Sequence, residues 1–221
     1  MKAALISDTH GMLPDPSKFE EADFIIHAGD IGPDRWKGNR AVFPWYQEEF
    51  AEWARAFYTK PIYLTWGNHD FIGERVQPDT IDEAMPDNVQ FLVDKQIEIE
   101  GKKVWFSPWS NLFGNWAFMK GENDLKEKYF KEIPDDTQVI VSHGPPYGLG
   151  DKIYWDGRDQ HVGSRSLLAF MDRSTQLELV ICGHIHEARG LYKDGGIDVR
   201  NVSLVDEKYQ PIFNPIIIDW S

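Results

Sequence analysis

The 221-residue chain has 36 acidic and 23 basic residues, which gives a formal net charge of −13. This balance disfavours stable binding to a nucleic-acid backbone over an open surface. A small anionic substrate stays possible, because bound metal ions reverse the field locally. With 42% hydrophobic and 14% aromatic residues, including nine tryptophans, the composition indicates a folded chain with a sizeable core.

The cysteine content and the N-terminus both point to a cytoplasmic protein. Cys182 is the only cysteine, so no internal disulfide can form, as expected in a reducing compartment. Its apolar neighbours predict a small buried residue rather than a nucleophile. The apolar run at residues 3–6 is too short for a signal-peptide core. No stretch approaches the roughly 20 apolar residues of a membrane span.

The chain alternates short apolar runs with helical patterns, without a low-complexity linker or repeat, and we expect a single domain over residues 1–221. Runs rich in Ile, Val and aromatic residues predict strands over 3–7, 24–29, 62–66, 89–93, 96–100, 103–107, 138–143, 177–183 and 215–220. Apolar residues at helical spacing predict helices over 44–60, 122–134 and 164–175. Ser164 or Ser166 is a candidate N-cap of the last helix.

Gly101 is expected to lie in the turn of a hairpin that joins two of these strands. The segments 32–43 and 71–88 are rich in Gly, Pro and Asp and predict loops.

Side chains that bind metals or move protons follow five of the predicted strands. They are Asp8 and His10, Asp30, the trio Asn68, His69 and Asp70, then His143, and finally His184 and His186. Five of the seven histidines occupy these positions. Because sites in open α/β sheets form outside the carboxyl ends of strands, the five loops are expected to meet.

The types of these side chains indicate divalent metal ions. Imidazole and carboxylate groups suit first-row ions such as zinc, iron and manganese. The single Cys182 excludes a structural zinc site built from cysteines. The donors are too many for one ion but fill two sites if one carboxylate bridges them. Two ions about 3.5–4 Å apart are the usual arrangement for displacement at phosphorus.

The order of the motifs resembles that of the calcineurin-like metallophosphoesterase superfamily. The motifs are D-x-H at 8–10, G-D at 29–30, G-N-H-D at 67–70, S-H-G at 142–144 and G-H-x-H at 183–186. Further stretches, at 107–118, 142–151, 163–168, 182–190 and 200–204, resemble its metallophosphoesterase-domain-containing (MPPED) branch. The regions 31–45 and 71–88 match least.

The resemblance implies a four-layer α/β/β/α sandwich, in which two mixed sheets are flanked by helices. It also implies two divalent metal ions, which could be Mn, Fe, Zn or Ni, with manganese favoured. Asp8, His10 and His186 would hold one ion, Asn68, His143 and His184 the other, and Asp30 would bridge them.

The resemblance implies that His69 would not bind metal but would protonate the leaving group or steady the transition state. An imidazole pKa near 6.5 suits general acid catalysis at neutral pH. Asp70 would orient the His69 ring, or it is simply a carboxylate that starts the loop; the sequence leaves both interpretations open.

The resemblance favours a phosphodiesterase that acts on small phosphodiesters such as cyclic nucleotides. A phosphomonoesterase or protein phosphatase with the same metals is the alternative. A nuclease is disfavoured by the negative charge, and the intact ligand set argues against a non-catalytic scaffold. The sequence leaves the oligomeric state open.

Two groups of residues could contribute to substrate choice. The segment 151–164, with Tyr154, Arg158 and His161, either lines the mouth of the site or forms a solvated loop. Trp109, Phe113 and Trp116 either stack on a substrate base or pack in the core.

Overall fold

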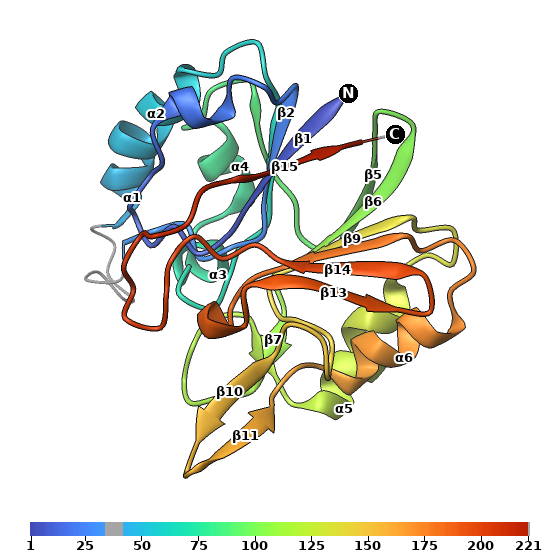
Figure 1. Cartoon of the computed structure of the whole chain (residues 1–221). Coiled ribbons are helices and arrows are strands. Elements are labelled where there is room, and N and C mark those ends of the chain that lie inside the picture. The colour runs from blue at the N-terminus through green and yellow to red at the C-terminus, as the bar shows by residue number, and fades with distance from the viewer. Residues whose placement is uncertain (34–41, 221) are drawn as a thin grey trace.

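The computed structural model describes residues 1–33 and 42–220. Two large mixed sheets pack face to face, and helices lie against their outer faces (Figure 1). The first sheet has the order β15 (Ile216–Asp219), β1 (Lys2–Ile6), β2 (Phe24–His27), β3 (Ile62–Leu64) and β4 (Val89–Phe91). Strands β1 to β4 run parallel, and only β15 is antiparallel to its neighbour.

The second sheet is parallel at its centre and antiparallel at both edges. Its order is β13 (Gly190–Asp194), β14 (Ile197–Asn201), β12 (Leu179–Cys182), β9 (Val139–Ser142), β6 (Lys102–Ser107) and β5 (Lys95–Ile99). The pairs β13–β14 and β5–β6 are antiparallel, and the three inner pairs are parallel. Two small sheets join β7 (Ser110–Asn111) to β8 (Met119–Lys120) and β10 (Lys152–Trp155) to β11 (Arg158–His161).

The helices are short and lie in two groups. The first group is η1 (Pro16–Phe19), α1 (Val42–Trp45), η3 (Tyr46–Phe50), α2 (Ala51–Arg55), α3 (Ile72–Arg75) and α4 (Pro78–Asp82). The second is α5 (Glu122–Asp124), η4 (Leu125–Tyr129), η5 (Phe130–Glu132) and α6 (Arg165–Arg173), and η6 (His186–Ala188) stands apart from both. Figure 1 shows α1 and α2 beside the first sheet and α5 and α6 beside the second.

Alternation along the strands explains the layers. In β1, Leu5 belongs to a buried cluster that takes residues from strands of both sheets and from no helix, so this cluster fills the space between the sheets. Ile6, the next residue, belongs to the cluster that includes the helices. In β9, Val141 belongs to the cluster between the sheets, and Ile140 belongs to the cluster that includes the helices. Both faces of these strands are buried, which is why their sequences read as continuous apolar runs.

The structure confirms the nine predicted strands and the hairpin at Gly101. The predicted helix 164–175 is α6, and the Ser164 hydroxyl caps it by accepting a hydrogen bond from the Leu167 N–H at 3.2 Å. The predicted helix 44–60 is a helical run from α1 to α2 with a π-helical turn, η3, in its middle. The predicted helix 122–134 breaks into three turns, α5, η4 and η5.

Two predicted loops contain regular structure, and the sequence did not predict the strands β7, β8, β10, β11, β13 and β14. The segment 71–88 contains α3 and α4, and the segment 151–164 forms the β10–β11 hairpin. Most residues of that hairpin are exposed, so its sequence lacks the apolar pattern that identifies a strand. Strands β13 and β14 were missed as well. Residues 34–41 of the loop expected over 32–43 lie outside the described residues.

The structure also bears on the environment of Cys182 and on the length of the helices. Cys182 is buried and free, as its apolar neighbours predict, and burial raises the pKa of its thiol. None of the helices within residues 1–33 and 42–220 has the length and apolar character needed to cross a membrane.

Candidate metal centre

Loops after five strands bring their polar side chains to one place. Three groups of residues each hold a set of candidate ligand atoms that lie within 4.8 Å of one another. The groups are Asp8–His10–His186, Asp8–Asp30–His143 and His10–Asp30–His69. The first group is the set that the sequence predicts for one metal ion. Asp8, His10 and Asp30 each belong to two groups, so the groups form one continuous cluster, which we call the polar cluster.

Asp30 lies at the centre of the polar cluster. Its Oδ2 atom is 3.4 Å from His143 Nε2 and 3.9 Å from the Nε2 atoms of both His10 and His69. On the other side of the cluster, Asp8 Oδ1 lies 3.3 Å from His186 Nε2. Both carboxylates are almost fully buried. A carboxylate shared between neighbouring groups matches the predicted bridging position of Asp30.

Two of the imidazoles turn their Nε2 atoms toward this cluster. His143 Nδ1 lies 2.9 Å from the carbonyl oxygen of Ala28, and His186 Nδ1 lies 3.1 Å from that of Asp206. A carbonyl oxygen only accepts hydrogen bonds, so both rings donate through Nδ1. Their Nε2 atoms face the carboxylates with a free lone pair when the rings are neutral. The donor set therefore fits divalent cations, which favour neutral imidazole together with carboxylate oxygens.

The other two predicted ligands of the second ion lie beside the cluster. Asn68 Oδ1 is 2.9 Å from His143 Nε2. The His184 ring lies 5.0 Å from the His143 ring, centroid to centroid, and the His184 backbone N–H donates to both carboxylate oxygens of Asp8 at 3.1 Å. His69, which the sequence analysis set apart from the ligands, offers a ring nitrogen to the group around His10 and Asp30.

Four of the predicted ligands have a strained backbone. Asp8, His10, Asp30 and His184 all have positive φ angles, of 54°, 44°, 56° and 68°. Residues other than glycine rarely adopt this backbone conformation, which costs on the order of 1–3 kcal/mol at each residue. Such strain gathers at sites where the surrounding structure holds a side chain in a working position, which supports a functional role for these loops.

Two motif glycines are required by close packing at the cluster. A Cβ atom added to Gly67 would lie 2.2 Å from Asp30 Oδ1 and 2.7 Å from the His143 ring. One added to Gly183 would lie 2.2 Å from Asp8 Oδ2. The glycines of the G-N-H-D and G-H-x-H motifs therefore leave room for the two buried carboxylates.

The charges of the cluster are strongly coupled. Burial alone would raise the pKa of the Asp8 carboxyl, but the hydrogen bond and charge of His186 outweigh burial and lower this pKa. Burial would likewise raise the pKa of the Asp30 carboxyl, but the nearby charges, mainly that of His143, hold this pKa well below its ordinary value. Burial would lower the pKa of His143, yet the charge of Asp30 raises it to about 9. His184 has a pKa lowered to about 3, mainly by burial, and is therefore neutral at pH 7.

Asp70 holds the loops rather than the His69 ring. Its carboxylate accepts hydrogen bonds from the backbone N–H groups of Ile31 at 3.0 Å, Gly32 at 3.0 Å and Gly67 at 2.8 Å, and from the Tyr46 hydroxyl at 3.0 Å. These bonds join the loop that carries Asp30 to the loop that carries Asn68 and His69. Of the two interpretations that the sequence leaves open for Asp70, these bonds favour the carboxylate that holds the loops.

A cavity of about 460 Å³ lies next to the cluster, with Asn68, His69, His184 and His186 in its wall. The three aromatic residues that sequence reasoning left open differ in their positions. Trp109 is buried and stacks on Tyr129 at 4.0 Å, so it belongs to the core. Trp116 stacks on the His69 ring at 4.3 Å, and Phe113 stands at the cavity rim, 70% exposed.

Tyr209 is a site residue that sequence reasoning missed. Its ring lies 4.7 Å from the His10 ring and 4.9 Å from the His186 ring, and it lines the cavity. No strand or catalytic motif surrounds it in the sequence, so only the fold reveals it. The 151–164 segment contributes Ile153 and Val162 to the wall, whereas Tyr154 is 71% exposed.

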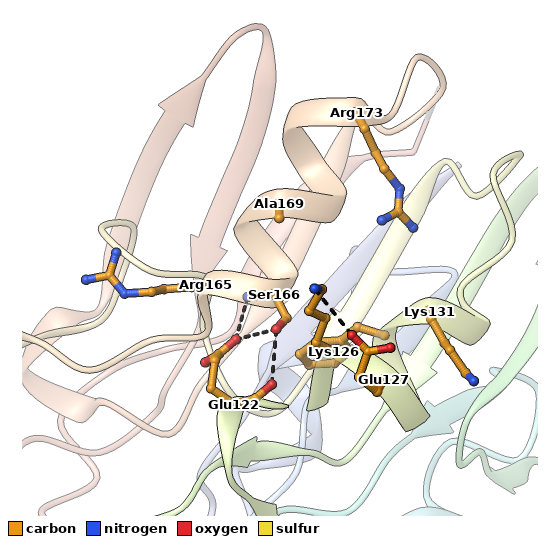
Figure 2. Close-up of a pocket in the computed structure, with 9 residues that line it drawn as sticks. Glu122, Lys126, Glu127, Lys131, Arg165, Ser166, Ala169 and Arg173 are labelled. Carbon is orange, nitrogen blue, oxygen red and sulfur yellow. Dashed lines mark hydrogen bonds and ion pairs between the residues drawn. The ribbon is translucent and has the colours of Figure 1, made fainter. Parts of the chain in front are cut away.

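A second hollow, of about 300 Å³, lies between η4 and α6 and has a different character (Figure 2). Glu122 accepts hydrogen bonds from Ser166, and Lys126 pairs with Glu127 at 3.3 Å. Arg165 lies over the ring of Tyr147. Each of these charges is engaged by a neighbour, and none of the described lining residues belongs to the polar cluster. We therefore place the site at the cavity beside the cluster.

Comparison with known proteins shows the family of the chain and its fold. Residues 1–188 match the family model described as calcineurin-like phosphoesterase, so the chain belongs to that family of metal-dependent phosphoesterases. Metallophosphoesterase domain-containing protein 1 of Homo sapiens is 28% identical to it over 97% of this chain and 69% of its own length. An uncharacterized protein of Methanocaldococcus jannaschii is 40% identical over 92% of this chain and 88% of its own length.

Solved structures show the same fold. The crystal structure of a dimetal phosphatase from Danio rerio superposes with a TM-score of 0.64 at 11% identity, over 98% of this chain and 91% of that one. A Thermus thermophilus protein superposes with a TM-score of 0.58 at 16% identity, over 90% of this chain and 88% of that one. The four-layer arrangement of two mixed sheets flanked by helices is thus the family fold.

Proposed function

We propose that the protein is a dinuclear metal-dependent phosphodiesterase that acts on small phosphodiesters. The observation that carries this proposal is the overlap of the three groups in the polar cluster, since Asp30 and Asp8 each face more than one imidazole. Two adjacent cation sites with a shared carboxylate are the arrangement that phosphoryl displacement uses. We also propose that residues 1–221 act as one domain, because both sheets supply the same site.

In this proposal Asp8, His10 and His186 hold one ion, Asn68, His143 and His184 hold the other, and Asp30 bridges them. Manganese is the preferred ion for first tests among Mn, Fe, Zn and Ni, all of which accept imidazole and carboxylate donors. When bound, such ions lower the pKa of water and neutralise charge on the phosphoryl oxygens.

The residues of the chain itself perform three further tasks in this proposal. His69 donates a proton to the departing oxygen, for which its ring stands beside the cluster and at the cavity wall. Asp70 keeps the loops of Asp30 and Asn68 in register. The aromatic side chains of the wall, Trp116 and Tyr209 among them, offer apolar surface beside the reacting groups.

The room beside the cluster favours a diester over a monoester. A diester keeps one ester group on phosphorus while the other leaves, and the cavity of about 460 Å³ is large enough to hold the retained group. A monoester retains no group on phosphorus once its single ester group has left, and its second negative charge finds no lysine or arginine among the described residues of the wall.

A rate comparison tests the proposal. The protein is stripped of metal, reloaded with manganese and assayed with an aryl phosphodiester, an aryl phosphomonoester and 2′,3′- and 3′,5′-cyclic nucleotides. Faster diester cleavage that chelation abolishes is the expected result. Faster monoester cleavage would make the protein a phosphomonoesterase, and no turnover despite stoichiometric metal binding would contradict an enzymatic role.

The role of His69 has its own test. His69→Ala should lower turnover by about 10²–10⁴-fold while two metal ions per chain remain bound. If metal loss accounts for the whole defect, His69 is a ligand instead, as its place in one of the three groups allows.

A further inference from the structure

The cavity beside the polar cluster has walls without formal charge. Among the residues that the structure describes there, none is Lys, Arg, Asp or Glu. Apart from the imidazoles of the cluster, the wall consists mainly of apolar and aromatic side chains, including Leu112, Trp116, Ile153, Ile185 and Tyr209. The occupant of such a space is an uncharged, apolar group, because a charged group would lose its hydration without a partner.

The second hollow shows that this lack of charge is specific to the cavity. Lys126, Lys131, Arg165 and Arg173 all line the hollow between η4 and α6 (Figure 2). Lysine and arginine side chains thus line a concave surface elsewhere in the chain, but not the cavity where a phosphorylated substrate would bind. In the cavity, the charge of the phosphoryl group would be met at the polar cluster alone.

Trp116 is held in place by the loop that contains it. Its ring stacks on His69 with an interplanar angle of 30°. The next residue, Ala117, donates its N–H to the Asn68 carbonyl at 3.1 Å, and the Phe118 N–H donates to the Glu74 carboxylate at 2.9 Å. The indole is therefore fixed relative to the loop that bears His69.

Tyr209 is held by a separate turn, which is tied to the cluster. The backbone N–H of Tyr209 donates to the carbonyl of Asp206 at 2.9 Å, and the Asp206 carboxylate accepts from the N–H of Gln210 at 2.8 Å. The same Asp206 carbonyl accepts the hydrogen bond from His186 Nδ1. Tyr209 adopts a φ of 59°, a conformation that costs a tyrosine free energy and that the turn maintains.

Resting on the proposed phosphoesterase function, we propose that Trp116 and Tyr209 are specificity-determining residues that receive the ester group of the substrate. Two fixed aromatic rings on separate loops face the same cavity as the imidazoles of His69 and His186. Aromatic side chains pack best against flat apolar groups. The site therefore selects esters with one phosphoryl group and an uncharged, aromatic or apolar ester group, and rejects polyphosphates and phosphorylated groups that carry further charge.

Binding of two phosphonates to the manganese-loaded full chain tests this inference. Phenylphosphonate and methylphosphonate carry the same charge and differ only in the apolar group, and calorimetry measures the affinity of each. We expect the phenyl compound to bind at least about tenfold more tightly to the wild type. Tyr209→Ala should reduce this ratio to about threefold or less, whereas Tyr209→Phe should retain it. Equal affinities in the wild type, or an unchanged ratio in Tyr209→Ala, would overturn the inference.

Controls separate this result from a general defect. Tyr154→Ala removes an aromatic side chain that is 71% exposed on β10 and does not line the cavity, so it should leave the ratio unchanged. Metal content should stay the same in the Tyr209 variants, because the ring contacts the histidines without being a ligand. Trp116→Leu should also lower the ratio.

Turnover distinguishes this inference from the proposed function. The 4-nitrophenyl diesters with a phenyl or a methyl group share a leaving group and a charge. Turnover of both without a phenyl preference would overturn the inference and support the function. A phenyl preference in phosphonate binding without turnover of any ester would support the cavity's selectivity and contradict the function.

Discussion

The two sheets bring different chemistry to the site formed by the polar cluster and the residues beside it. Loops after β1, β2 and β3 of the first sheet carry its carboxylates and its amide, namely Asp8, Asp30, Asn68 and Asp70. The second sheet contributes imidazoles, His143 after β9 and His184 and His186 after β12. The carboxylates of the site thus come from the first sheet, and three of its five imidazoles come from the second sheet.

The two halves are also held differently. The loops of the first sheet are bound to one another, since the Asp8 N–H donates to the Gly29 carbonyl at 2.9 Å and the His10 N–H to that of Asp30 at 3.0 Å. The second sheet reaches across the interface, where His143 donates to Ala28 and the His184 N–H to Asp8. The carboxylates are therefore organised within the first sheet together with His10 and His69, whereas the imidazoles of His143, His184 and His186 depend on the docking of the two sheets. Variants in the two halves should fail in different ways.

The largest effect is expected from Asp30→Ala. Because Asp30 faces three imidazoles, its loss should remove both metal ions and lower turnover by at least about 10³-fold. Elemental analysis and rate measurements check this. Asp136→Ala is the matched control, since that exposed carboxylate pairs only with surface groups such as Lys103. Retention of two ions in Asp30→Ala would remove the bridging role.

A smaller, one-sided effect is expected from His143→Ala. The group Asp8–His10–His186 is untouched, so one ion per chain should remain while the other is lost. Turnover should fall by about 10²-fold, because a single ion no longer stabilises both the attacking and the leaving oxygen. Loss of both ions would show that the second sheet organises the whole site, and would contradict carboxylates that are organised within the first sheet.

Asp70→Asn should weaken the alignment of the loops without removing metal. The amide replaces one acceptor oxygen by a donor that faces the N–H groups of Ile31, Gly32 or Gly67. We expect a loss of about 1–3 kcal/mol in the free energy of unfolding. Turnover should fall by about tenfold at unchanged metal content. Denaturant titration measures the stability, and a rate assay with metal analysis measures turnover at known metal content. A variant with normal stability would contradict the role of Asp70 in holding the two loops.

The smallest effect on turnover, with a change in stability alone, concerns His27, the last residue of β2. Burial lowers its pKa to about 3, and the neutral ring accepts from the Gly29 N–H and contacts the Thr9 hydroxyl at 3.0 Å. Between pH 6.5 and 3 the unfolded chain binds a proton at this position that the folded chain does not. Stability therefore falls as the pH falls through this window, by up to about 1.4 kcal/mol per pH unit.

The difference between wild type and His27→Gln isolates this contribution. Urea unfolding of the metal-free proteins at pH 7, 6 and 5 should show the wild type losing stability more steeply on acidification. Parallel profiles for the two proteins would mean that His27 does not carry the effect.

Much of the fold and of the candidate site can be predicted from local sequence patterns. The apolar run of β1 ends at Ile6 and Asp8 follows within two residues, and β9 ends just before His143 in the same way. Continuous apolar strands and polar strand ends are both local signals. The order of the motifs adds the family, which the match over residues 1–188 bears out.

The remaining features depend on contacts between distant segments or on weak patterns. The partners of Asp70 include Ile31 and Tyr46, which are 39 and 24 residues away, so the sequence leaves its role open. Tyr209 meets His10 only through the fold. The β10–β11 hairpin did carry one signal, the Asp156-Gly157 pair, whose two positive φ angles are those of a tight hairpin turn.

Anomalous diffraction from crystals grown with manganese would show directly whether the site holds two metal ions. We expect two anomalous peaks about 3.5–4 Å apart at the polar cluster, with Asp30 between them and His69 bound to neither. A single peak at the cluster, or no peak there at all, would contradict a dinuclear centre assembled from both sheets.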